Sequence, residues 1–522
     1  MNANKKSGTV MNLVNKLWKN WKWVALVGLG VLLLGLILRL YHLTIIPVFA
    51  DEAIYIRWSQ IMASEPTLRF LPLSDGKQPL FMWILMFYVK KLGDPLFAGR
   101  LLSAVSGMGS MIGLFLLTYH VFKSKVAAVA SSFFWAISPL SLFFDRMALV
   151  DSLLTCFGIW ILFISLHLAE KVRLDLAMMI GFLLGLASLT KSPALFFAVL
   201  IPVGVILVKK PKEIFKYIGF LTVSYLIAFG MYNIQRLGPN FALLSSRTQD
   251  YVFPLSRILT NPTDPIKYNL PTVFGWLSAM GPAALLVLAA VGALVNYKDK
   301  KKYILILGVW FLAPLVYETE YAKGLTLRYI LFLVPPLFVM AGGALGKLTG
   351  KWKLITTLAL AAFVIQAGVF DWFLLTSPQK ANFPWRERSG YFQEWTSGIG
   401  IKEAADYIRA KRNQDPDTKI VVGTEGYFGT LPDGFMMYVQ DLPNIIVVGT
   451  GLGLKEIPDP LVESKLSGNL TYLIINRSRL AIDPAKLNLT LIRSYPKEPR
   501  LPGTLEYTQN GPQDQLMFFE LN

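Results

Sequence analysis

The stretch PVFADEAIYIRW, residues 47–58, follows directly on an apolar run over residues 23–46. About 20 apolar residues are enough for a helix to cross a bilayer. We therefore expect Asp51 and Glu52 at the membrane surface, where the first span ends. In a helix that continues from them, Asp51 and Tyr55 are four residues apart and share one face. The stretch predicts an interfacial helix with a carboxylate at its head.

Taken alone, these two carboxylates have two interpretations. An Asp before a helix is a good N-cap, and a Glu in the first turn interacts favourably with the helix dipole. Alternatively, one of them performs chemistry at the membrane surface. Other features of the sequence are needed to distinguish a helix cap from a catalytic carboxylate.

Composition identifies the class of protein. Of the 522 residues, 54% are hydrophobic and only 16% are charged, and the mean hydropathy is +0.48. Soluble domains carry about 25% charged residues. The chain is therefore expected to be an integral membrane protein with many spans. Because the first apolar run is too long for the core of a signal peptide, we expect it to remain as an anchor.

Cysteine and histidine, which form disulfides or bind metals, are scarce in this chain. The single cysteine, Cys156, excludes disulfides within the chain. The three histidines, His42, His120 and His167, are far apart in sequence and form no metal-ligand motif. Acid–base chemistry is therefore expected from carboxylates.

The net charge of +18 would indicate nucleic-acid binding in a soluble protein, but here much of the lysine lies in short loops between apolar runs. An excess of Lys and Arg in short loops marks the cytoplasmic side of a membrane protein. We therefore expect no nucleic-acid partner and read these loops as a topology signal.

Eleven apolar runs are suitable for spanning, whereas a further run, residues 79–89, is too short to cross comfortably. If the segment 79–92 lies along the outer surface, the Lys-rich loops fall on the cytoplasmic side. If it crosses, the loops after it move outside and the positive-inside rule is violated repeatedly. We predict a polytopic all-α domain with about 11 transmembrane helices and a cytoplasmic N-terminus. The runs are 23–42, 98–121, 126–144, 147–168, 175–190, 193–208, 214–232, 272–296, 303–318, 327–346 and 353–374.

The composition changes sharply near residue 375. A helix signal over residues 401–412 is followed by short β-rich runs, and a helix followed by a strand is a common α/β unit. We predict a transmembrane catalytic domain over residues 1–375 and a soluble extracytoplasmic α/β domain over residues 376–522. The β-rich runs are 419–422, 444–448, 471–475 and 516–521.

The expected outer face collects charged residues at the edges of the spans. Ionisable groups near the apolar layer are costly, and they usually pair or serve a site. Each has a simpler interpretation as an anchor, a turn residue, an interfacial ion pair or a snorkelling side chain. Several on one membrane face predict a shared polar cavity. They are Lys77 in GKQPL, Arg146 and Asp151 in FDRMALVDS, Lys191 in LTKSP, and Arg328 before Tyr329.

Two other segments have simple interpretations. The loop over residues 238–251 is either a plain linker or a cover for the cavity. The glycine-rich segment 423–430 lacks the Gly-Lys-Ser/Thr of a phosphate-binding P-loop and is interpreted as a turn-rich loop.

Four motifs in this order resemble the GT-C glycosyltransferases, most closely the protein O-mannosyltransferase and aminoarabinose transferase group (family 39). They are Asp51-Glu52, KQPL at 77–80, Arg146…Asp151-Ser152 and TKSP at 190–193. The resemblance covers about residues 1–375. Gln78 stands where the family often has a second proline, whereas the lysine before it is kept. The resemblance implies an inverting transfer of a hexosyl or pentosyl group from a polyprenyl-phosphate donor to an acceptor hydroxyl on the extracytoplasmic face of the cell membrane.

The residues fit this chemistry. The acceptor hydroxyl must lose its proton to a positioned base, and the charge of the leaving phosphate must be met by cations. We assign Asp51 as the base. The further assignments are Glu52 for holding the acceptor or tuning Asp51, Lys77 and Arg328 for the phosphate, Arg146, Asp151 and Lys191 as second choices, and Tyr55, Tyr321 and Tyr329 for the sugar site.

The resemblance also bears on cofactors and partners. Some GT-C enzymes use a divalent cation, but the group that this chain resembles generally works without one, so we expect no essential metal or other cofactor. The implied partners are the lipid-linked sugar donor, the bilayer and an acceptor (protein, lipid or glycan) that the sequence does not identify.

Two other functions would also explain many spans. A transporter or flippase of a lipid-linked substrate usually places ionisable groups or broken helices near the bilayer midplane, in repeated halves. Here the charges gather at one face and no repeat is visible. A non-catalytic binding or assembly protein would leave the set of Asp51, Lys77 and Arg328 without a purpose. The substitution Asp51→Asn separates these functions, because it should abolish transfer only in an enzyme.

Overall fold

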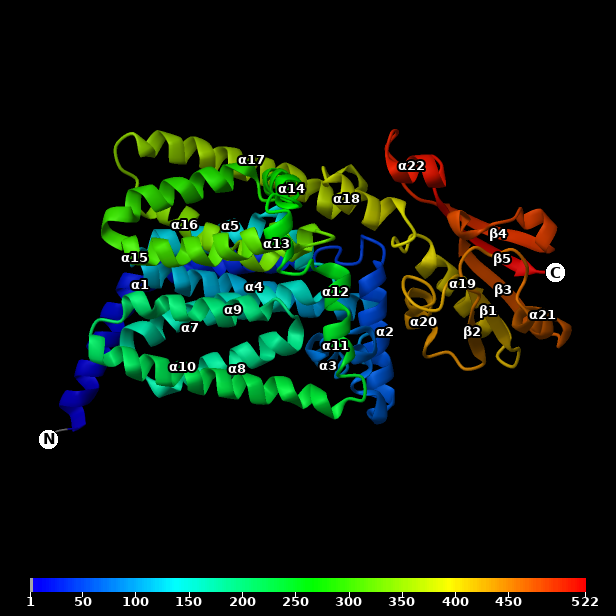
Figure 1. Ribbon diagram of the computed structural model, residues 1–522, viewed down its shortest axis with the longest axis horizontal. Helices are drawn as coiled ribbons and strands as arrows, with labels where there is room; N and C mark the ends of the chain where they lie inside the picture. The colour runs from blue at the N-terminus through cyan, green and yellow to red at the C-terminus, as the bar shows by residue number, and fades with distance from the viewer. Residues whose placement is uncertain (1–2) are drawn as a thin grey trace.

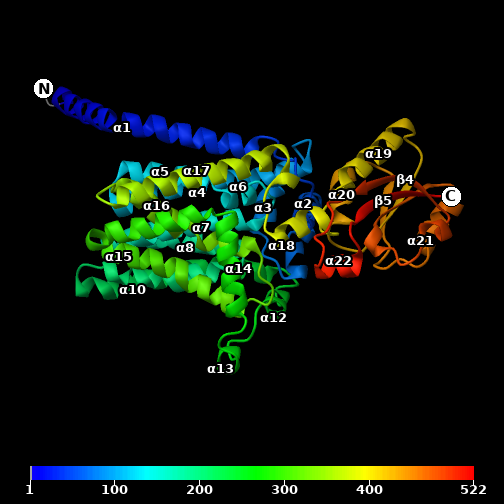
Figure 2. The ribbon, with the colours of Figure 1, turned by 90° about the horizontal axis from the view of Figure 1, so that it is seen from above.

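The computed structural model describes residues 3–522, with side chains from residue 21 onward except at positions 248 and 258. A bundle of helices fills one part of the molecule, and a mixed sheet with its own helices fills the other (Figure 1). The first helix, α1 (Ala3–Leu40), runs along the bundle and projects beyond it (Figure 2). The N-terminus therefore lies at the end of the bundle that is far from the sheet.

Six described helices are long and apolar enough to cross a membrane, and a seventh span results if the bent pair η5 (Leu327–Leu333) and α16 (Pro335–Gly346) is counted as one. The expectation of about 11 spans is therefore not matched. One reason is α15 (Ala283–Tyr321), where a kink at Lys300 joins two of the expected runs. The other long helices are α1, α4 (Pro95–Phe122), α7 (Val150–Lys171), α10 (Pro211–Tyr232) and α17 (Trp352–Thr376).

Shorter apolar helices account for further expected runs. They are α5 (Lys125–Ile137), followed by α6 (Pro139–Phe144), then α8 (Leu174–Thr190), and α9 (Ala194–Leu200) with η3 (Ile201–Leu207). They lie in the same bundle as the long helices (Figures 1 and 2). Proline at the start of α6 and just before α9 explains why these runs are interrupted, because proline cannot continue a preceding helix.

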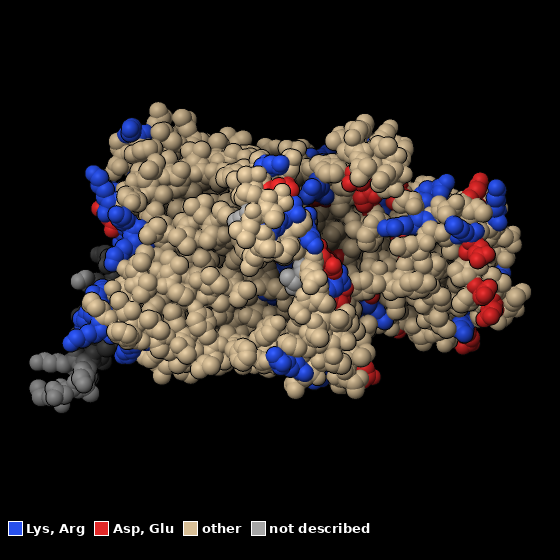
Figure 3. All heavy atoms as spheres, viewed as in Figure 1, with Lys and Arg blue, Asp and Glu red and all other residues tan. Residues whose placement is uncertain are grey.

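Small residues allow the helices to pack closely. A Cβ atom on Gly292 in α15 would lie 1.8 Å from the carbonyl oxygen of Met340 in α16, so only glycine fits at this contact. Because lipid offers apolar helices no gain from burial, close backbone approach of this kind is a main source of helix association in membranes. Figure 3 shows a side of the bundle with few charged groups, and Lys and Arg gather at the end away from the sheet. This distribution agrees with the expected cytoplasmic lysines, although the orientation stays a prediction.

The helix α2 (Ala50–Ser64) lies crosswise over the other end of the bundle (Figure 1). It begins within the quoted stretch, as expected. The carboxylate of Glu52 accepts a hydrogen bond from the backbone N–H of Phe49 at 3.0 Å, which satisfies a donor at the start of the helix. The chain continues through η1 (Pro66–Leu68) and η2 (Leu71–Asp75) to α3 (Leu80–Leu85). With six residues, α3 is too short to span, in agreement with the expected surface segment.

The C-terminal part is an α/β domain around a five-stranded sheet of order β2-β1-β3-β5-β4. β1 (Ile420–Thr424) is parallel to β2 (Ile445–Gly449) and to β3 (Leu470–Asn476). β5 (Gln515–Leu521) is antiparallel to β3 and to β4 (Leu489–Pro496). The expected helix is present as α19 (Ile401–Gln414), with α20 (Asp433–Val439) and α21 (Asp459–Leu466) following it.

This domain is fixed to the bundle through α2. The Arg57 guanidinium donates to the Gln440 side chain at 2.9 Å, and the Gln60 amide donates to the carbonyl oxygen of Met437 at 2.9 Å. The rings of Trp58 and Phe428 stack with their centroids 5.7 Å apart. The helix that carries Asp51 is therefore held from both sides, by the bundle and by the α/β domain.

Candidate active site

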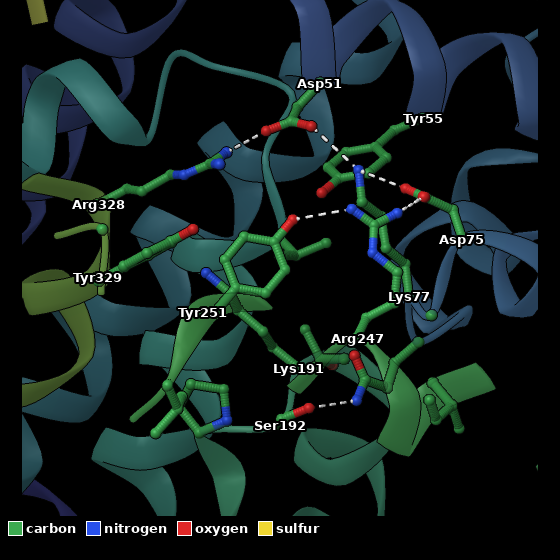
Figure 4. A pocket seen from close by; sticks show the side chains of 18 of the residues that line it. Asp51, Tyr55, Asp75, Lys77, Lys191, Ser192, Arg247, Tyr251, Arg328 and Tyr329 are labelled. Atoms are coloured by element: carbon green, nitrogen blue, oxygen red, sulfur yellow. Dashed lines mark hydrogen bonds and ion pairs between the residues drawn. The ribbon is translucent and has the colours of Figure 1, made fainter. Parts of the chain in front are cut away.

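A cavity of about 230 Å³ opens where α2 meets the end of the bundle. Its walls come from segments far apart in sequence: α2, the turn before α3, the connection from α8 to α9, the loop around residues 244–252, and the junction of α15 with η5. Figure 4 shows the charged side chains that converge on it. Of the residues assigned from sequence, the cavity is lined by Asp51, Tyr55, Lys77, Lys191, Arg328 and Tyr329.

Asp51 is bound by two cations. Its Oδ1 lies 3.0 Å from Nζ of Lys77, and its Oδ2 lies 2.5 Å from Nη1 of Arg328. Burial raises the pKa of the Asp51 carboxyl, but the charges of Arg328 and Lys77 outweigh burial and hold the pKa well below its usual value. Asp51 is therefore ionised in the substrate-free protein, and both its oxygens are already occupied.

Lys77 is held in place by a network on the opposite side. Its Nζ lies 3.3 Å from Oδ2 of Asp75 and 5.0 Å from the centre of the Tyr55 ring. Gly76, just before it, has φ +66°, and a Cβ there would lie 2.9 Å from the Leu243 carbonyl oxygen. A left-handed turn without a side chain thus aims Lys77 into the cavity.

Arg247 belongs to the site although it was not assigned from sequence. It follows α11 (Leu243–Ser246), forms an ion pair with Asp75 and donates to the Tyr251 hydroxyl at 3.2 Å. The loop that carries it pairs with the chain after α15, through the bridge between Val252 and Ala322. The loop over residues 238–251 therefore covers the cavity and is more than a linker. The sequence signal was an Arg and a Tyr four residues apart in a loop on the expected outer face.

Lys191 stands on the other wall. Its Nζ lies 2.6 Å from Oδ1 of Asp151 and 4.5 Å from the centre of the Tyr329 ring. Asp151 itself is buried and lies behind Lys191, outside the lining of the cavity. Beside them, the Gln78 amide donates to the Ser192 hydroxyl at 2.7 Å, so the residue that departs from the family pattern connects two walls.

Glu52 lies away from the cavity, in contrast to the expectation. Its carboxylate is fully buried, accepts two hydrogen bonds of 2.8 Å from Arg100 and one of 2.6 Å from the backbone N–H of Ala148. Residues adjacent in a helix point in different directions, so the carboxylate next to Asp51 reaches α4 instead of the substrate side. Its contacts assign it to positioning α2.

Arg146 and Tyr321 also lie outside the lining. The Arg146 guanidinium donates to carbonyl oxygens at the end of α1, including those of Leu38 and Tyr41 at 2.7 Å. It therefore satisfies the orphan carbonyls of a helix C-terminus. The Tyr321 ring packs on Tyr317, with centroids 4.8 Å apart. Neither residue is placed to contact a substrate in this cavity.

Two lining carboxylates were missed by sequence reasoning. Asp75 bridges Lys77 and Arg247, and Glu318 lies in the last turn of α15. Asp75 could have been found from its position two residues before Lys77. In the part of the chain that the structure describes, no group of three or more His, Cys, Asp and Glu side chains is placed to hold a metal ion.

Comparison with known proteins agrees with this architecture. Residues 76–232 match the family model described as dolichyl-phosphate-mannose-protein mannosyltransferase. The crystal structure of ArnT from Cupriavidus metallidurans bound to undecaprenyl phosphate is similar, with a TM-score of 0.58 and 15% identity over 96% of this chain and 98% of that chain. Its apo state gives a TM-score of 0.59 and 13% identity over the same shares. A search of curated protein sequences finds no match.

The matched segment contains Lys77, Asp151 and Lys191, and the structural similarity extends over both the bundle and the C-terminal domain. The resemblance inferred from the sequence motifs is thereby confirmed. The chain is a multi-pass membrane protein with the GT-C fold, and its residues 76–232 resemble the family described as dolichyl-phosphate-mannose-protein mannosyltransferase.

Proposed function

We propose that the protein transfers a sugar from a polyprenyl-phosphate donor to an acceptor hydroxyl at the extracytoplasmic face of the membrane. The observation that carries this proposal is the Asp51 carboxylate, which lies between Lys77 and Arg328 in a cavity at one end of the apolar bundle. A carboxylate beside a cluster of cations supplies the two groups that the reaction needs, a base for the acceptor and a charge partner for the leaving phosphate.

The donor phosphate would compete with Asp51 for its cations. Lys and Arg bind phosphate oxygens by charge-assisted hydrogen bonds. When the phosphate approaches Lys77, Arg328 and Arg247, the cations divide between two anions, and the hold on Asp51 weakens. The base is therefore released by the binding of the substrate that it serves.

The reaction is then a single nucleophilic displacement at the anomeric carbon. The acceptor oxygen attacks the anomeric carbon while its proton passes to Asp51, and the bond from that carbon to the phosphate oxygen breaks. The electron pair of this bond leaves with the polyprenyl phosphate, whose negative charge stays with the cations. Attack from the face opposite the phosphate inverts the anomeric configuration.

The membrane location of the cavity favours a lipid-linked donor. The prenyl chain can stay in the bilayer beside the apolar bundle while the phosphate reaches the cavity at its end. Undecaprenyl phosphate is the first lipid to test, since it is bound in the ArnT structure of the same fold. A transporter would need its charged groups near the middle of the bundle, whereas here they lie where α2 crosses its end.

Sugar transfer in proteoliposomes tests the proposal. Wild type and Asp51→Asn are each given a panel of radiolabelled polyprenyl-phosphate sugars, including hexosyl and pentosyl donors, with membrane extract as acceptor. We expect wild type to consume one donor and Asp51→Asn to consume none. Both proteins should elute as folded monodisperse species in size-exclusion chromatography in detergent. Equal consumption by the two proteins would contradict Asp51 as the base. Movement of labelled lipid across the bilayer without consumption would favour a flippase.

A further inference from the structure

Glu318 differs from the other acidic groups at the site. Asp51, Asp75 and Asp151 each form at least one ion pair with a cation of the cavity. Glu318 lines the same cavity, yet among the described residues its carboxylate forms no hydrogen bond and no ion pair, and Lys191 is the one charged group that acts on it from a distance. Both its oxygens are therefore available to a ligand.

Helix stability does not explain a carboxylate at this position. Glu318 lies in the last turn of α15, which ends at Tyr321, where the partial charge of the helix is negative. An acidic side chain there interacts unfavourably with the helix dipole. An ionisable group at the edge of a membrane-spanning helix that neither pairs nor caps is by default a candidate for a functional role.

Lys191, the cation on the same wall, does not pair with Glu318. The Lys191 ammonium already binds Asp151 at 2.6 Å and lies over the Tyr329 ring. Glu318 lines the cavity together with Lys191 and the aromatic residue Tyr329. Such a combination suits a sugar ring, because the ring packs against the aromatic face and its hydroxyl groups donate to the carboxylate.

We propose that Glu318 binds hydroxyl groups of the donor sugar and thereby contributes to the choice of sugar. This inference rests on the proposed function. The phosphate of the donor is bonded directly to the anomeric carbon, so the sugar must lie within the same cavity as the phosphate-binding cations. A carboxyl group cannot neutralise the charge of the phosphate, which assigns Glu318 to the neutral part of the donor. Its two oxygens can accept from two neighbouring hydroxyl groups at once.

The test compares a lipid with and without its sugar. Binding of undecaprenyl phosphate and the KM for the sugar-bearing donor found in the transfer assay are measured for wild type, Glu318→Gln and Glu318→Ala. The matched control is Glu320→Gln, the same change two residues along α15 at a buried carboxylate that does not line the cavity.

We expect Glu318→Gln to raise the donor KM about 10-fold and Glu318→Ala about 100-fold, as for the loss of a hydrogen bond to a charged group. Binding of undecaprenyl phosphate should stay within about twofold of wild type in both variants, and Glu320→Gln should leave both quantities unchanged. Changed relative KM values for donors with different hydroxyl patterns would give the same support.

Three results would overturn the assignment. An unchanged donor KM in Glu318→Ala removes any contact with the sugar. If the Glu318 variants lose undecaprenyl phosphate binding as strongly as the donor KM rises, the substitution acts on phosphate binding or on folding. A fall in kcat at unchanged KM would make Glu318 a group that acts only in the transition state. Failure of the proposed function itself is distinguished, because wild type would then consume no donor although undecaprenyl phosphate binding could still be compared.

Discussion

Asp51 and Arg328 are separated by 277 positions in the chain, yet their side chains form an ion pair of 2.5 Å. The pair joins α2, which lies over the end of the bundle, to η5, which opens the bent helix pair. Lys77 occupies the other oxygen of the same carboxylate at 3.0 Å. Asp51 and these two cations thus neutralise one another, and in the proposed mechanism the donor phosphate separates them.

The first prediction follows from this competition. In Asp51→Asn, Lys77 and Arg328 lose their anionic partner, so undecaprenyl phosphate should bind about tenfold more tightly, a gain of about 1.4 kcal/mol. Transfer should be lost in the same variant because an amide cannot accept the proton. Equilibrium binding and transfer are measured on one preparation. Asp299→Asn, which removes an exposed ion pair with Lys347, is the control. Weaker binding in Asp51→Asn would contradict the competition.

The pH dependence of the two kinetic constants should differ. Because the Asp51 pKa is lowered in the free protein, the carboxylate stays ionised and gives kcat/KM no acid limb above about pH 5. In the donor complex the phosphate shares the cations and the Asp51 pKa rises, so kcat should fall at a higher pH than kcat/KM as the solution is acidified. Rates measured from about pH 4 to pH 9 test this. Coincident acid limbs would show that the donor leaves the carboxylate paired.

The sequence predicted the membership of the site better than the direction of its side chains. Asp51, Lys77, Lys191 and Arg328 reach the cavity because each stands at the end of an apolar run on the same expected face. Glu52 does not reach the cavity. The sequence could not show this, because two adjacent carboxylates give no sign of which one turns toward the bundle. The sequence also cannot distinguish Arg146 from a substrate-binding arginine, because the carbonyl groups that it binds belong to a helix end about 100 residues earlier.

The same limit applies to the fold. Four strands of the C-terminal sheet lie close to their expected positions. β4 was missed because its alternation is weak and much of it is exposed. The count of about 11 spans is not confirmed, because some apolar runs, such as 126–144, form two short helices with a proline at the start of the second, and two other runs are joined in α15. Hydropathy measures how apolar a run is, but it does not show where the helix within that run breaks or bends.

A third prediction concerns the loop that covers the cavity. Arg247→Ala should raise the donor KM about tenfold, because it removes a cation from the phosphate region and leaves Asp75 with Lys77 alone. Arg236→Ala is the matched control. Arg236 precedes the same loop, is exposed and donates to Asn233. The two variants are compared in steady-state transfer. Equal effects would show that the loop responds to its net charge, without a specific role for Arg247.

A fourth prediction concerns metals. Among the described residues, no group of three or more His, Cys, Asp and Glu side chains is placed to hold an ion, and the charge of the phosphate can be met by Lys77, Arg247 and Arg328. Transfer by purified protein should therefore persist in excess EDTA. Loss of activity that Mg²⁺ or Mn²⁺ restores would show that an ion bound between the donor phosphate and a carboxylate takes part.

The last prediction separates the two adjacent carboxylates. The Glu52 and Arg100 side chains form a buried pair of 2.8 Å, and Arg100 also donates to the carbonyl oxygens of Leu43 and Ile46. Breaking a buried pair by removing one partner costs about 3–5 kcal/mol, because a charge is left uncompensated. Glu52→Gln should therefore lower the melting temperature in detergent.

The fraction of Glu52→Gln that remains folded should keep the donor KM of wild type, since Glu52 does not reach the cavity. Replacing both partners with apolar residues, as in Glu52→Leu with Arg100→Met, should recover part of the stability, because a buried ion pair is often matched by well-packed apolar side chains. Recovery is partial since the carbonyl oxygens that Arg100 satisfied lose their donor. A variant that melts as wild type but transfers no sugar would place Glu52 in the chemistry.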